Sequence, residues 1–469
     1  MVNNTIAAIS TPLGPGGIGV VRISGSLAHT IMKRLFVRKK RRNNRTGRSS
    51  EEGRFTSHVV YYGHLVEPGN ENIIDEVLAI YMKGPKSFTR EDVVEFHSHS
   101  GFVVLDRILH AVVDAGADLS GPGEFSKRAF LNGRIDLTQA EAVIDLINAP
   151  CETAVQMASR QVAGGLRDAV EALTVTIARL HAVCEANIEF YESVEDDNAR
   201  LTVQETLSNS VMPEVTELIK RQKDTAIFKE GVLLAIAGAP NVGKSSLLNR
   251  LVERETAIVS EVPGTTRDIV RDYFSINGVP VVICDTAGIH DTRDPVECLG
   301  IIKARDHFHR ADIVLLVLEA VRKLNRLEKK LIEELKHTRM IVVINKADIA
   351  DKEAVKDTQQ KTKDIPQVKV SAKTGIGVAA LKDLIFNDLI SGKKVGEQAG
   401  ATPNLRQRTI LEEIRQKLQR CLLSAEAEQS LDVISGLLND ILHLLGDISG
   451  NPKKEDLYDH IFSQFCIGK

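Results

Sequence analysis

Gly-Ala-Pro-Asn-Val-Gly-Lys-Ser, at residues 238–245, is the stretch that decides the fold, because it lies between the apolar run 233–237 and the helix-like segment 246–250. Gly238 and Gly243 allow the backbone to curl so that successive N–H groups point at phosphate oxygens. A strand, a glycine-framed loop and a helix in this order predict a phosphate-binding loop at the carboxyl edge of a doubly wound parallel sheet.

Two side chains of this loop predict its chemistry. Lys244 brings a positive charge to the β- and γ-phosphates, and the hydroxyl group of Ser245 is a ligand for Mg²⁺. The positive end of the following helix also favours phosphate. The loop therefore predicts a nucleoside triphosphate as ligand, together with Mg²⁺.

Further motifs follow along the chain: Pro-Gly-Thr-Thr-Arg-Asp at 263–268, Asp-Thr-Ala-Gly at 285–288, Asn-Lys-Ala-Asp at 345–348 and Ser-Ala-Lys at 371–373. Thr266 offers a second hydroxyl ligand to Mg²⁺, and Asp285 is expected just beyond the metal's own ligands. Asp348 predicts guanine, because one carboxylate accepts hydrogen bonds from N1–H and the exocyclic amino group, a donor pair that adenine lacks. Asn345 and Lys346 are expected to support the base, and 371–373 to close over it.

The residues predicted to bind GTP are Asn241, Val242, Gly243, Lys244, Ser245, Ser246, Ser260, Thr265, Thr266, Asp285, Thr286, Ala287, Gly288, Asn345, Lys346, Asp348, Ser371, Ala372 and Lys373. The motifs occur in the order, and next to the apolar runs, that a GTP-binding domain requires. Their combination predicts GTP as the ligand.

Two positions depart from the commonest GTPase pattern. Ile289 follows Asp-Thr-Ala-Gly where many GTPases have a glutamine that orients the attacking water. Asn241 lies inside the phosphate-binding loop, and its amide oxygen is a candidate ligand for K⁺, which would neutralise charge at the β–γ bridge. The predicted K⁺ ligands are Asn241, Ser260, Val262 and Thr265. An Asx turn that only shapes the loop is the alternative for Asn241.

Composition limits the class of protein. The 469 residues are 43% hydrophobic and 26% charged, with a net charge of −3, which is typical of a globular protein and does not favour general nucleic-acid binding. The six cysteines form no C-x-x-C pair, which disfavours a disulfide framework or zinc site. The sequence shows no targeting segment and no apolar run of the roughly 18 residues that a membrane span needs. These features predict a cytoplasmic protein without a membrane segment.

The pattern of elements predicts a multidomain protein that combines α/β and all-α parts. Short apolar runs with Gly and Pro predict a mixed α/β domain at 1–118. Helical periodicity predicts one helical domain in two parts, 119–215 and 389–469. Between them, alternating strands and helices predict an inserted P-loop domain at 216–388.

The rest of the chain resembles the tRNA-modification GTPase family MnmE (TrmE). The resemblance extends almost from end to end, and it is carried by residues 5–8, 16–25, 87–95, 121–137 (which include Gly-Pro-Gly-Glu-Phe) and the terminal Phe-Cys-Ile-Gly-Lys at 465–469. It implies a folate-binding and dimerising N-terminal domain, a helical domain and an inserted G domain. It also implies a homodimer that forms a heterotetramer with an FAD-dependent partner and modifies C5 of the wobble uridine in certain tRNAs.

The same resemblance implies a 5-formyltetrahydrofolate-type one-carbon donor, bound by Arg22, Glu95, Arg134 and Lys469. The residue types suit this ligand, because cationic side chains pair with its carboxylates and Glu95 pairs with N–H donors of the pterin. Structural ion pairs are the alternative for each residue.

Several residues remain open to more than one interpretation. Cys466 is either a reactive thiol or a small apolar residue, and the family places it near the folate; a lipidation motif is disfavoured because Lys469 ends the chain. Ile302 occupies the position at which the family carries a glutamate thought to orient water, so no catalytic base is assigned. The basic insert 38–48, which has no counterpart in the family pattern, is either a solvated loop or an RNA-contacting arm. His97 and His99 are expected to be structural rather than metal ligands.

Two other classes of function compete with a tRNA-modifying GTPase. A ribosome-assembly GTPase would carry an RNA-binding appendage with a basic surface instead of the Arg22, Glu95 and Lys469 set. A folate-dependent one-carbon transferase would turn over folate without GTP.

Overall fold

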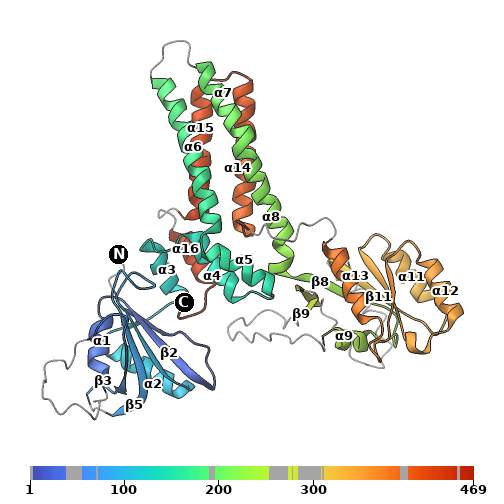
Figure 1. Ribbon diagram of the computed structural model, residues 1–469, viewed down its shortest axis with the longest axis horizontal. Coiled ribbons are helices and arrows are strands. Elements are labelled where there is room, and N and C mark those ends of the chain that lie inside the picture. The colour runs from blue at the N-terminus through green and yellow to red at the C-terminus, as the bar shows by residue number, and fades with distance from the viewer. Residues whose placement is uncertain are drawn as a thin grey trace. The chain divides into compact units, whose positions relative to one another are not determined.

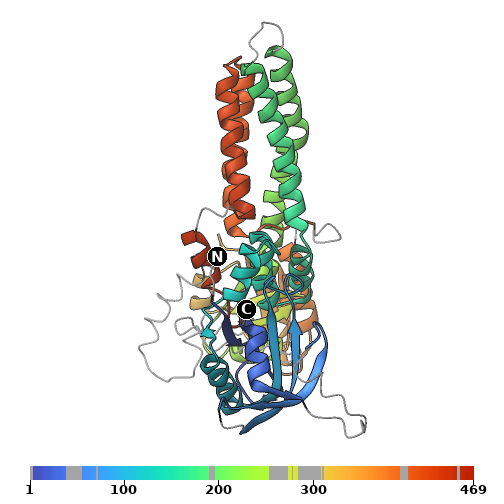
Figure 2. The same ribbon diagram turned by 90° about the vertical axis from the view of Figure 1, so that its left-hand side faces the viewer.

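The computed structural model describes residues 4–38, 55–69, 72–189, 196–252, 273–276, 278–283, 308, 311–390, 400–450 and 455–469. The chain forms two units, the first made of residues 1–144, 170–174 and 442–469 and the second of 145–169 and 175–441. Figures 1 and 2 show the elements of each unit from two sides. No helix among the described residues is both long enough and apolar enough to cross a membrane.

A seven-stranded sheet organises the first unit, in the order β3-β4-β5-β6-β2-β1-β7. The strands are β1 (Ile6–Ile9), β2 (Gly16–Ser24), β3 (Phe36–Arg38), β4 (Val60–Val66), β5 (Ile73–Met82), β6 (Val93–Ser100) and β7 (Asp118–Leu119). The β1–β7 pair is parallel, and the other neighbouring strands are antiparallel. Arg22 and Glu95 are direct partners across β2 and β6.

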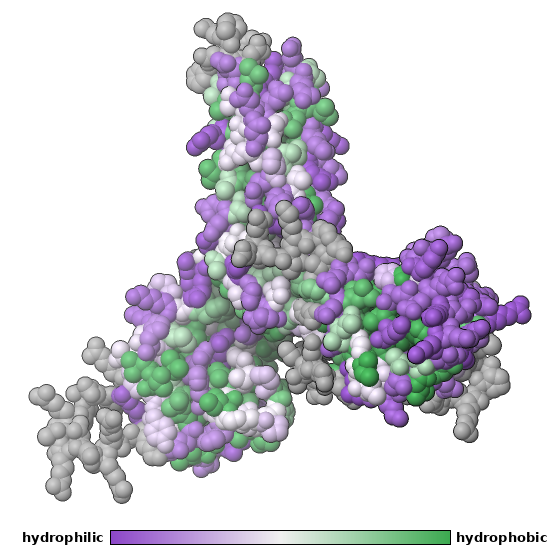
Figure 3. All heavy atoms as spheres, turned by 45° about the vertical axis from the view of Figure 1, so that its right-hand side comes forward, coloured by the Kyte–Doolittle hydropathy of each residue, from purple (hydrophilic) through white to green (hydrophobic). Residues whose placement is uncertain are grey.

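Two helices pack on the sheet of the first unit, α1 (Ala28–Leu35) and α2 (Phe102–Asp114). Their buried residues join those of the strands in one apolar cluster that contains Ile31, Leu105 and Phe96. The strands alternate accordingly, so that in β4 Tyr61 is buried whereas its neighbours Val60 and Tyr62 remain 55% and 47% exposed. Figure 3 shows clusters of apolar residues on the visible surface of this unit.

The last helix of the chain packs beside a helix that is formed by part of the sequence motif at residues 121–137. The C-terminus therefore lies near this motif. In the first unit, α3 (Glu124–Leu131) and α16 (Glu455–Phe462) lie beside each other, and α4 (Leu137–Ile147) follows α3. Phe130 and Tyr458 pack edge to face with ring centroids 4.9 Å apart, and Phe462 joins the same cluster. This aromatic contact holds α16 in place, and the C-terminal tail starts from the end of that helix.

Helices make up one part of the second unit, and the long ones among them lie side by side in both views (Figures 1 and 2). The helices are α5 (Glu152–Val162), α6 (Gly165–Glu189), α7 (Asp196–Thr206), α8 (Met212–Glu230), α14 (Leu405–Glu426) and α15 (Leu431–Ser449), with a π-helical turn at Leu207–Val211. Residues 170–174 of α6 and 442–449 of α15 belong to the first unit. Helix α14 packs against α7 and α8, so the segments before and after the inserted sheet meet. This pairing agrees with the predicted helical domain in two parts.

A six-stranded sheet forms the rest of the second unit, in the order β13-β12-β11-β8-β10-β9. The strands are β8 (Val232–Ala237), β9 (Tyr273–Ile276), β10 (Val279–Ile283), β11 (Ile313–Glu319), β12 (Met340–Asn345) and β13 (Gln367–Lys369), and the helices are α9 (Lys244–Val252), α11 (Arg326–Glu334), α12 (Lys352–Lys361) and α13 (Val378–Ile390). Only β9 pairs antiparallel among these described strands.

Both faces of this sheet are covered. Along β11, Ile313, Leu315 and Val317 enter one apolar cluster, whereas Val314 and Leu316 enter another on the opposite face. A strand buried on both sides needs an unbroken apolar run, which explains the sequence of β11. The doubly wound sheet predicted from the sequence is confirmed.

The structure suggests other domain limits than the sequence did. The predicted limit between 215 and 216 lies inside α8, which continues to Glu230, and α3 and most of α4 belong to the first unit. Gly231, at φ 77°, is the single residue between α8 and β8. We propose that the inserted domain begins at Gly231.

Candidate functional site

The phosphate-binding loop has the backbone that its glycines predict. Gly238 and Gly243 have φ values of 149° and 94°, and a Cβ at these positions would lie 2.5 Å from the carbonyl oxygen of Val317 and 2.4 Å from Nδ2 of Asn345. Asn241, at φ 63°, is also left-handed, a conformation that asparagine tolerates better than most residues. Both close approaches exclude any side chain at the two glycines.

The loop leads directly into α9. Lys244 is the first residue of this helix, and its Nζ donates to the carbonyl oxygens of Gly238 and Ala239, each at 3.0 Å. Ser245 and Ser246 follow in the first turn and are exposed. An ammonium group inside the loop, two hydroxyl groups and a helix N-terminus suit a phosphate group and Mg²⁺, which prefers oxygen ligands.

Asn345 connects the phosphate-binding loop to the Ser-Ala-Lys motif. Its side chain is buried, donates from Nδ2 to the carbonyl oxygen of Val242 at 2.8 Å and accepts from the N–H of Ala372 at 3.0 Å. The residue ends β12 and reaches both loops because β8, β12 and β13 are parallel and end at one edge of the sheet. Asn345 therefore joins the phosphate and base ends of the predicted site.

Asp348 has the geometry expected of a base-recognising carboxylate. The Ser371 hydroxyl donates to its Oδ1 at 2.6 Å, and this hydrogen bond is the main reason that the pKa of Asp348 lies below its ordinary value, with the charge of Lys373 adding to it. The exposed carboxylate is thus ionised near neutral pH and held in place. It can accept two hydrogen bonds from a guanine base.

Three residues at this edge were missed by the sequence interpretation. Arg250, in α9, donates from Nε and Nη2 to the carbonyl oxygens of Ala372 and Lys373, at 3.2 and 2.8 Å. Glu319, at the end of β11, forms an ion pair with Lys346. Gly377 has φ 78°, and its Cβ would meet the carbonyl oxygen of Lys369 at 2.0 Å. The glycine-rich Thr-Gly-Ile-Gly at 374–377 was the available signal for the last of these.

Several predicted site residues lie outside the described residues, namely Ser260, Val262, Thr265, Thr266, Asp285, Thr286, Ala287 and Gly288, as do Ile289 and Ile302. Of the predicted Mg²⁺ and K⁺ ligands, the structure thus describes Ser245 and Asn241. Strand β10 ends at Ile283, beside β8 in the sheet.

A second polar cluster lies in the first unit, around Arg22. Its Nε pairs with Oε1 of Glu95 at 2.8 Å, and its Nη1 donates to the carbonyl oxygen of Gly468 at 3.3 Å. His97 Nε2 lies 3.0 Å from Oε2 of Glu95. Burial alone would raise the pKa of Glu95, but the charge of Arg22 and the hydrogen bonds from His97 and Arg22 outweigh it and lower that pKa.

The C-terminal tail is built into this cluster. Ile467 pairs with Pro122 in an isolated bridge, and the N–H of Phe125 donates to the carbonyl oxygen of Lys469 at 3.1 Å. Gly468 has φ 89°, and its Cβ would lie 2.4 Å from the carbonyl oxygen of Ile9. The structure therefore brings Arg22, Glu95 and the last two residues together, although 446 positions separate Arg22 from Gly468.

Arg134 reaches the same cluster only through aromatic side chains. Its Nη1 donates to the carbonyl oxygen of Ser87 at 2.7 Å, and its guanidinium lies 5.4 Å from the ring centroid of Phe88. Phe88 packs against a small apolar cluster that contains Phe125, whose ring centroid is 5.8 Å from the guanidinium of Arg22. Each of the two cations thus lies over an aromatic ring at the same cluster, and cation–π attraction stabilises both contacts.

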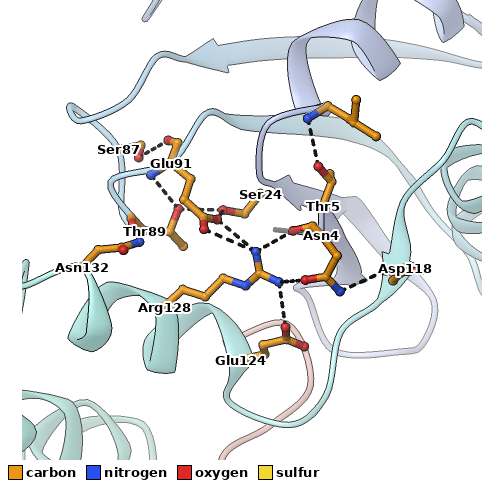
Figure 4. Close-up of polar contacts among 11 residues, drawn as sticks. Asn4, Thr5, Ser24, Ser87, Thr89, Glu91, Asp118, Glu124, Arg128 and Asn132 are labelled. Atoms are coloured by element: carbon orange, nitrogen blue, oxygen red, sulfur yellow. Dashed lines mark hydrogen bonds and ion pairs between the residues drawn. The ribbon is translucent and has the colours of Figure 1, made fainter. Parts of the chain in front are cut away.

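Arg128, which is itself buried, is the centre of a network of partly buried and exposed partners that the sequence interpretation missed (Figure 4). Its guanidinium donates to Oδ1 and the carbonyl oxygen of Asn4, both at 2.8 Å, to Oε1 of Glu124 at 2.9 Å and to both carboxylate oxygens of Glu91 at 3.3 Å. Ser24 donates to the same Glu91 at 2.7 Å. The network holds α3 against the start of β1 and the loop that carries Phe88.

The remaining sequence predictions concern histidine, cysteine and the basic insert. His99 Nδ1 pairs with Oδ1 of Asp75 at 2.8 Å, so both histidines contact carboxylates, and the described residues contain no group of three potential metal ligands. Cys466 is exposed, and its carbonyl oxygen accepts from the N–H of Gly123. Of the insert, only Arg38 is described; its guanidinium lies 4.2 Å from the ring centroid of Tyr61.

The whole chain is similar to proteins of one family. A model described as the MnmE helical domain matches residues 137–466, and one described as GTP-binding protein TrmE N-terminus matches residues 5–134. The tRNA modification GTPase MnmE of Desulfotalea psychrophila is 40% identical over 475 residues, which cover 100% of this chain and 98% of the relative. The protein of the same name from Carboxydothermus hydrogenoformans is 38% identical over 472 residues, 100% of both chains.

Among solved structures, the G domain of the FeoB iron transporter of T. maritima is 30% identical, with a TM-score of 0.25. The match covers 34% of this chain and 98% of that chain.

Proposed function

The chain belongs to the MnmE family of tRNA modification GTPases, and from this premise we propose that it hydrolyses GTP as a component of a tRNA-modifying system. The observation that carries the proposal is the carboxylate of Asp348, which Ser371 orients at the same sheet edge as the phosphate-binding loop. This carboxylate selects guanine, and Asn345 fixes its distance from the loop that binds the phosphates.

The residues of the loop would act on the triphosphate by charge and position. Lys244 lies within the loop and neutralises phosphate charge, while the first N–H groups of α9 bind phosphate oxygens. Ser245 and Thr266 would hold Mg²⁺, which would supply further positive charge to the phosphates. Asn241, Ser260, Val262 and Thr265 would hold K⁺, which would supply a further positive charge to the triphosphate.

GTP hydrolysis by the purified chain tests this function, together with tRNA composition in a strain that lacks it. We expect hydrolysis to be faster in KCl than in NaCl by roughly 10²-fold, the usual effect of one transition-state charge. Modified wobble uridine should disappear from the tRNA of the strain and return with the gene. Equal rates in both salts would refute the role of K⁺, and intact wobble modification would refute the tRNA function.

We also propose that the first unit binds a 5-formyltetrahydrofolate-type donor. Arg22 supports this proposal, because it lies at the junction of β2, β6 and the C-terminal tail, where its charge can pair with a ligand carboxylate. Glu95 is held ionised beside it and can accept N–H groups of a pterin. Lys469 supplies a second cation, and Arg134, which lies over the ring of Phe88, supplies a third.

Replacing Arg22 by Met should weaken binding of 5-formyltetrahydrofolate by roughly 10- to 100-fold, the value of one hydrogen-bonded charge. Calorimetric titration of the full chain measures this. Arg107→Met is the matched control, because Arg107 pairs with Glu67 on the surface, away from the tail. Unchanged affinity in Arg22→Met would contradict the proposed folate site.

The proposed assembly is a cytoplasmic homodimer that joins an FAD-dependent partner in a heterotetramer. Support for the homodimer comes from the sheet face of the first unit, where Val60, Tyr62 and Leu78 are between 41% and 55% exposed and neighbour one another across β4 and β5. An apolar face of this kind is typical of an interface. Light scattering should give twice the mass of 51.5 kDa, and a monomer at micromolar concentration would contradict the homodimer.

A further inference from the structure

A series of side chains of alternating charge extends from Lys346 into the body of the second unit. Lys346 belongs to the same motif as the base-recognising Asp348. The ammonium group of Lys346 pairs with Oε1 of Glu319, and Oε2 of the same carboxylate lies 2.9 Å from Nε of Arg322. Nη1 and Nη2 of Arg322 donate to Oε2 and Oε1 of Glu328, both at 2.9 Å. Two cations and two carboxylates therefore form one continuous series of ion pairs.

The series of ion pairs is fixed at its buried end, which is Glu328. Glu328 is completely buried, and it completes a capping box with Asn325 at the start of α11, in which each residue binds the backbone N–H of the other. Its bidentate contact with Arg322 is the geometry in which guanidinium and carboxylate bind best. Arg322 is thus held by a rigid helix terminus and cannot follow Lys346 if that side chain moves.

The outer end is a flexible side chain at a special backbone position. Lys346 has φ 64° and ψ 37°, and its ammonium group is partly exposed. Glu319 is the last residue of β11 and lies opposite Asn345 in the strand register, so the ion pair joins the two strands at the site edge. Without Glu319, the four-carbon stem of Lys346 would sample many rotamers.

We propose that Glu319, Arg322 and Glu328 form a positioning relay that holds Lys346 in place and so slows dissociation of a bound guanine nucleotide. None of the three needs to touch the nucleotide. Arg322 orients Glu319, Glu319 restrains Lys346, and Glu328 anchors the whole series of ion pairs. The relay rests on the proposed function, because it acts on the guanine nucleotide that this site would bind.

Dissociation of GDP labelled with N-methylanthraniloyl on its ribose tests the relay in the full chain. Arg322→Met should raise the dissociation rate about 10-fold, within the roughly 30-fold that the rotamer entropy of one lysine allows. Lys323→Met is the matched control, because it removes an exposed cation from the neighbouring position, and its rate should stay unchanged. Equal rates for the two variants would overturn the relay.

A double-mutant cycle separates positioning from a general structural effect. In a Lys346→Met background, adding Arg322→Met should change the dissociation rate less than 2-fold, because Arg322 acts through Lys346. Full additivity of the two effects would overturn the relay. If Arg322→Met does not fold, Arg322→Met combined with Glu328→Gln replaces it, since Gln keeps the capping box and leaves no buried charge unpaired.

The outcomes for the relay and for the proposed function differ. A wild-type chain that fails to retain the labelled GDP would refute guanine-nucleotide binding itself. If the wild type retains the labelled GDP and Arg322→Met does not release it faster, only the relay is refuted.

Discussion

Asp348→Asn is expected to lower kcat/KM for GTP by on the order of 10⁴-fold and to create activity with xanthosine triphosphate. The size follows from the principle that a site built to hydrogen-bond a polar edge rejects a ligand whose edge does not match. Asn presents one acceptor and one donor, so it cannot accept from both N1–H and the 2-amino group of guanine. Xanthine has an oxygen at that second position, to which the Asn amide can donate.

Release of phosphate from each nucleotide, measured over a range of concentrations, checks this prediction. The Ser371 hydroxyl, which donates to Oδ1 at 2.6 Å, can still do so in Asp348→Asn, so the side chain should keep its orientation. Asp357→Asn is the control, because Asp357 is paired with Lys361 on α12 and takes no part in the site. If Asp348→Asn retained GTP activity and gained none with xanthosine triphosphate, Asp348 would not be the base-reading residue.

Arg128→Met should destabilise the first unit by about 2–3 kcal/mol, which is less than the cost of breaking a fully buried ion pair because both carboxylate partners are partly exposed. Arg128 is only 4% exposed, and its removal would leave Glu91 and Glu124 beside an apolar side chain without their shared cation (Figure 4). It would also remove the donor to two oxygens of Asn4, but water can replace that donor because Asn4 is exposed. Loss of one partner of a buried ion pair is far more costly than loss of a surface pair.

Hydrogen exchange of peptides from β1 and β2 in increasing urea measures this loss, because the chain contains no tryptophan to report unfolding by fluorescence. Lys127→Met is a matched control at the preceding position. Lys127 pairs with Asp459, whose side chain is 64% exposed, so we expect a change below about 1 kcal/mol. Similar small effects in both variants would contradict the importance of the Arg128 network.

How much of the molecule could be predicted from its sequence depends on how local each feature is. The apolar run of β11 predicts a strand buried on both faces, and the glycines at 238 and 243 predict the backbone of the phosphate-binding loop. The limit placed at 216 lies inside α8, because this helix continues without a breaker until Gly231. Helical periodicity identifies a helix but does not show to which unit it belongs.

The sequence by itself determined the type of ligand and the order of the domains. A glycine-framed loop indicates phosphate binding and Asn-Lys-Ala-Asp indicates guanine binding, each within a few consecutive residues. Only the tertiary structure decided that Arg22 meets Glu95 and Gly468, that Arg128 holds α3 to the start of β1, and that Glu328 anchors Lys346 through Arg322 and Glu319. These contacts depend on strand register and on where the chain returns after hundreds of residues. Neither is encoded in the spacing of the residues involved.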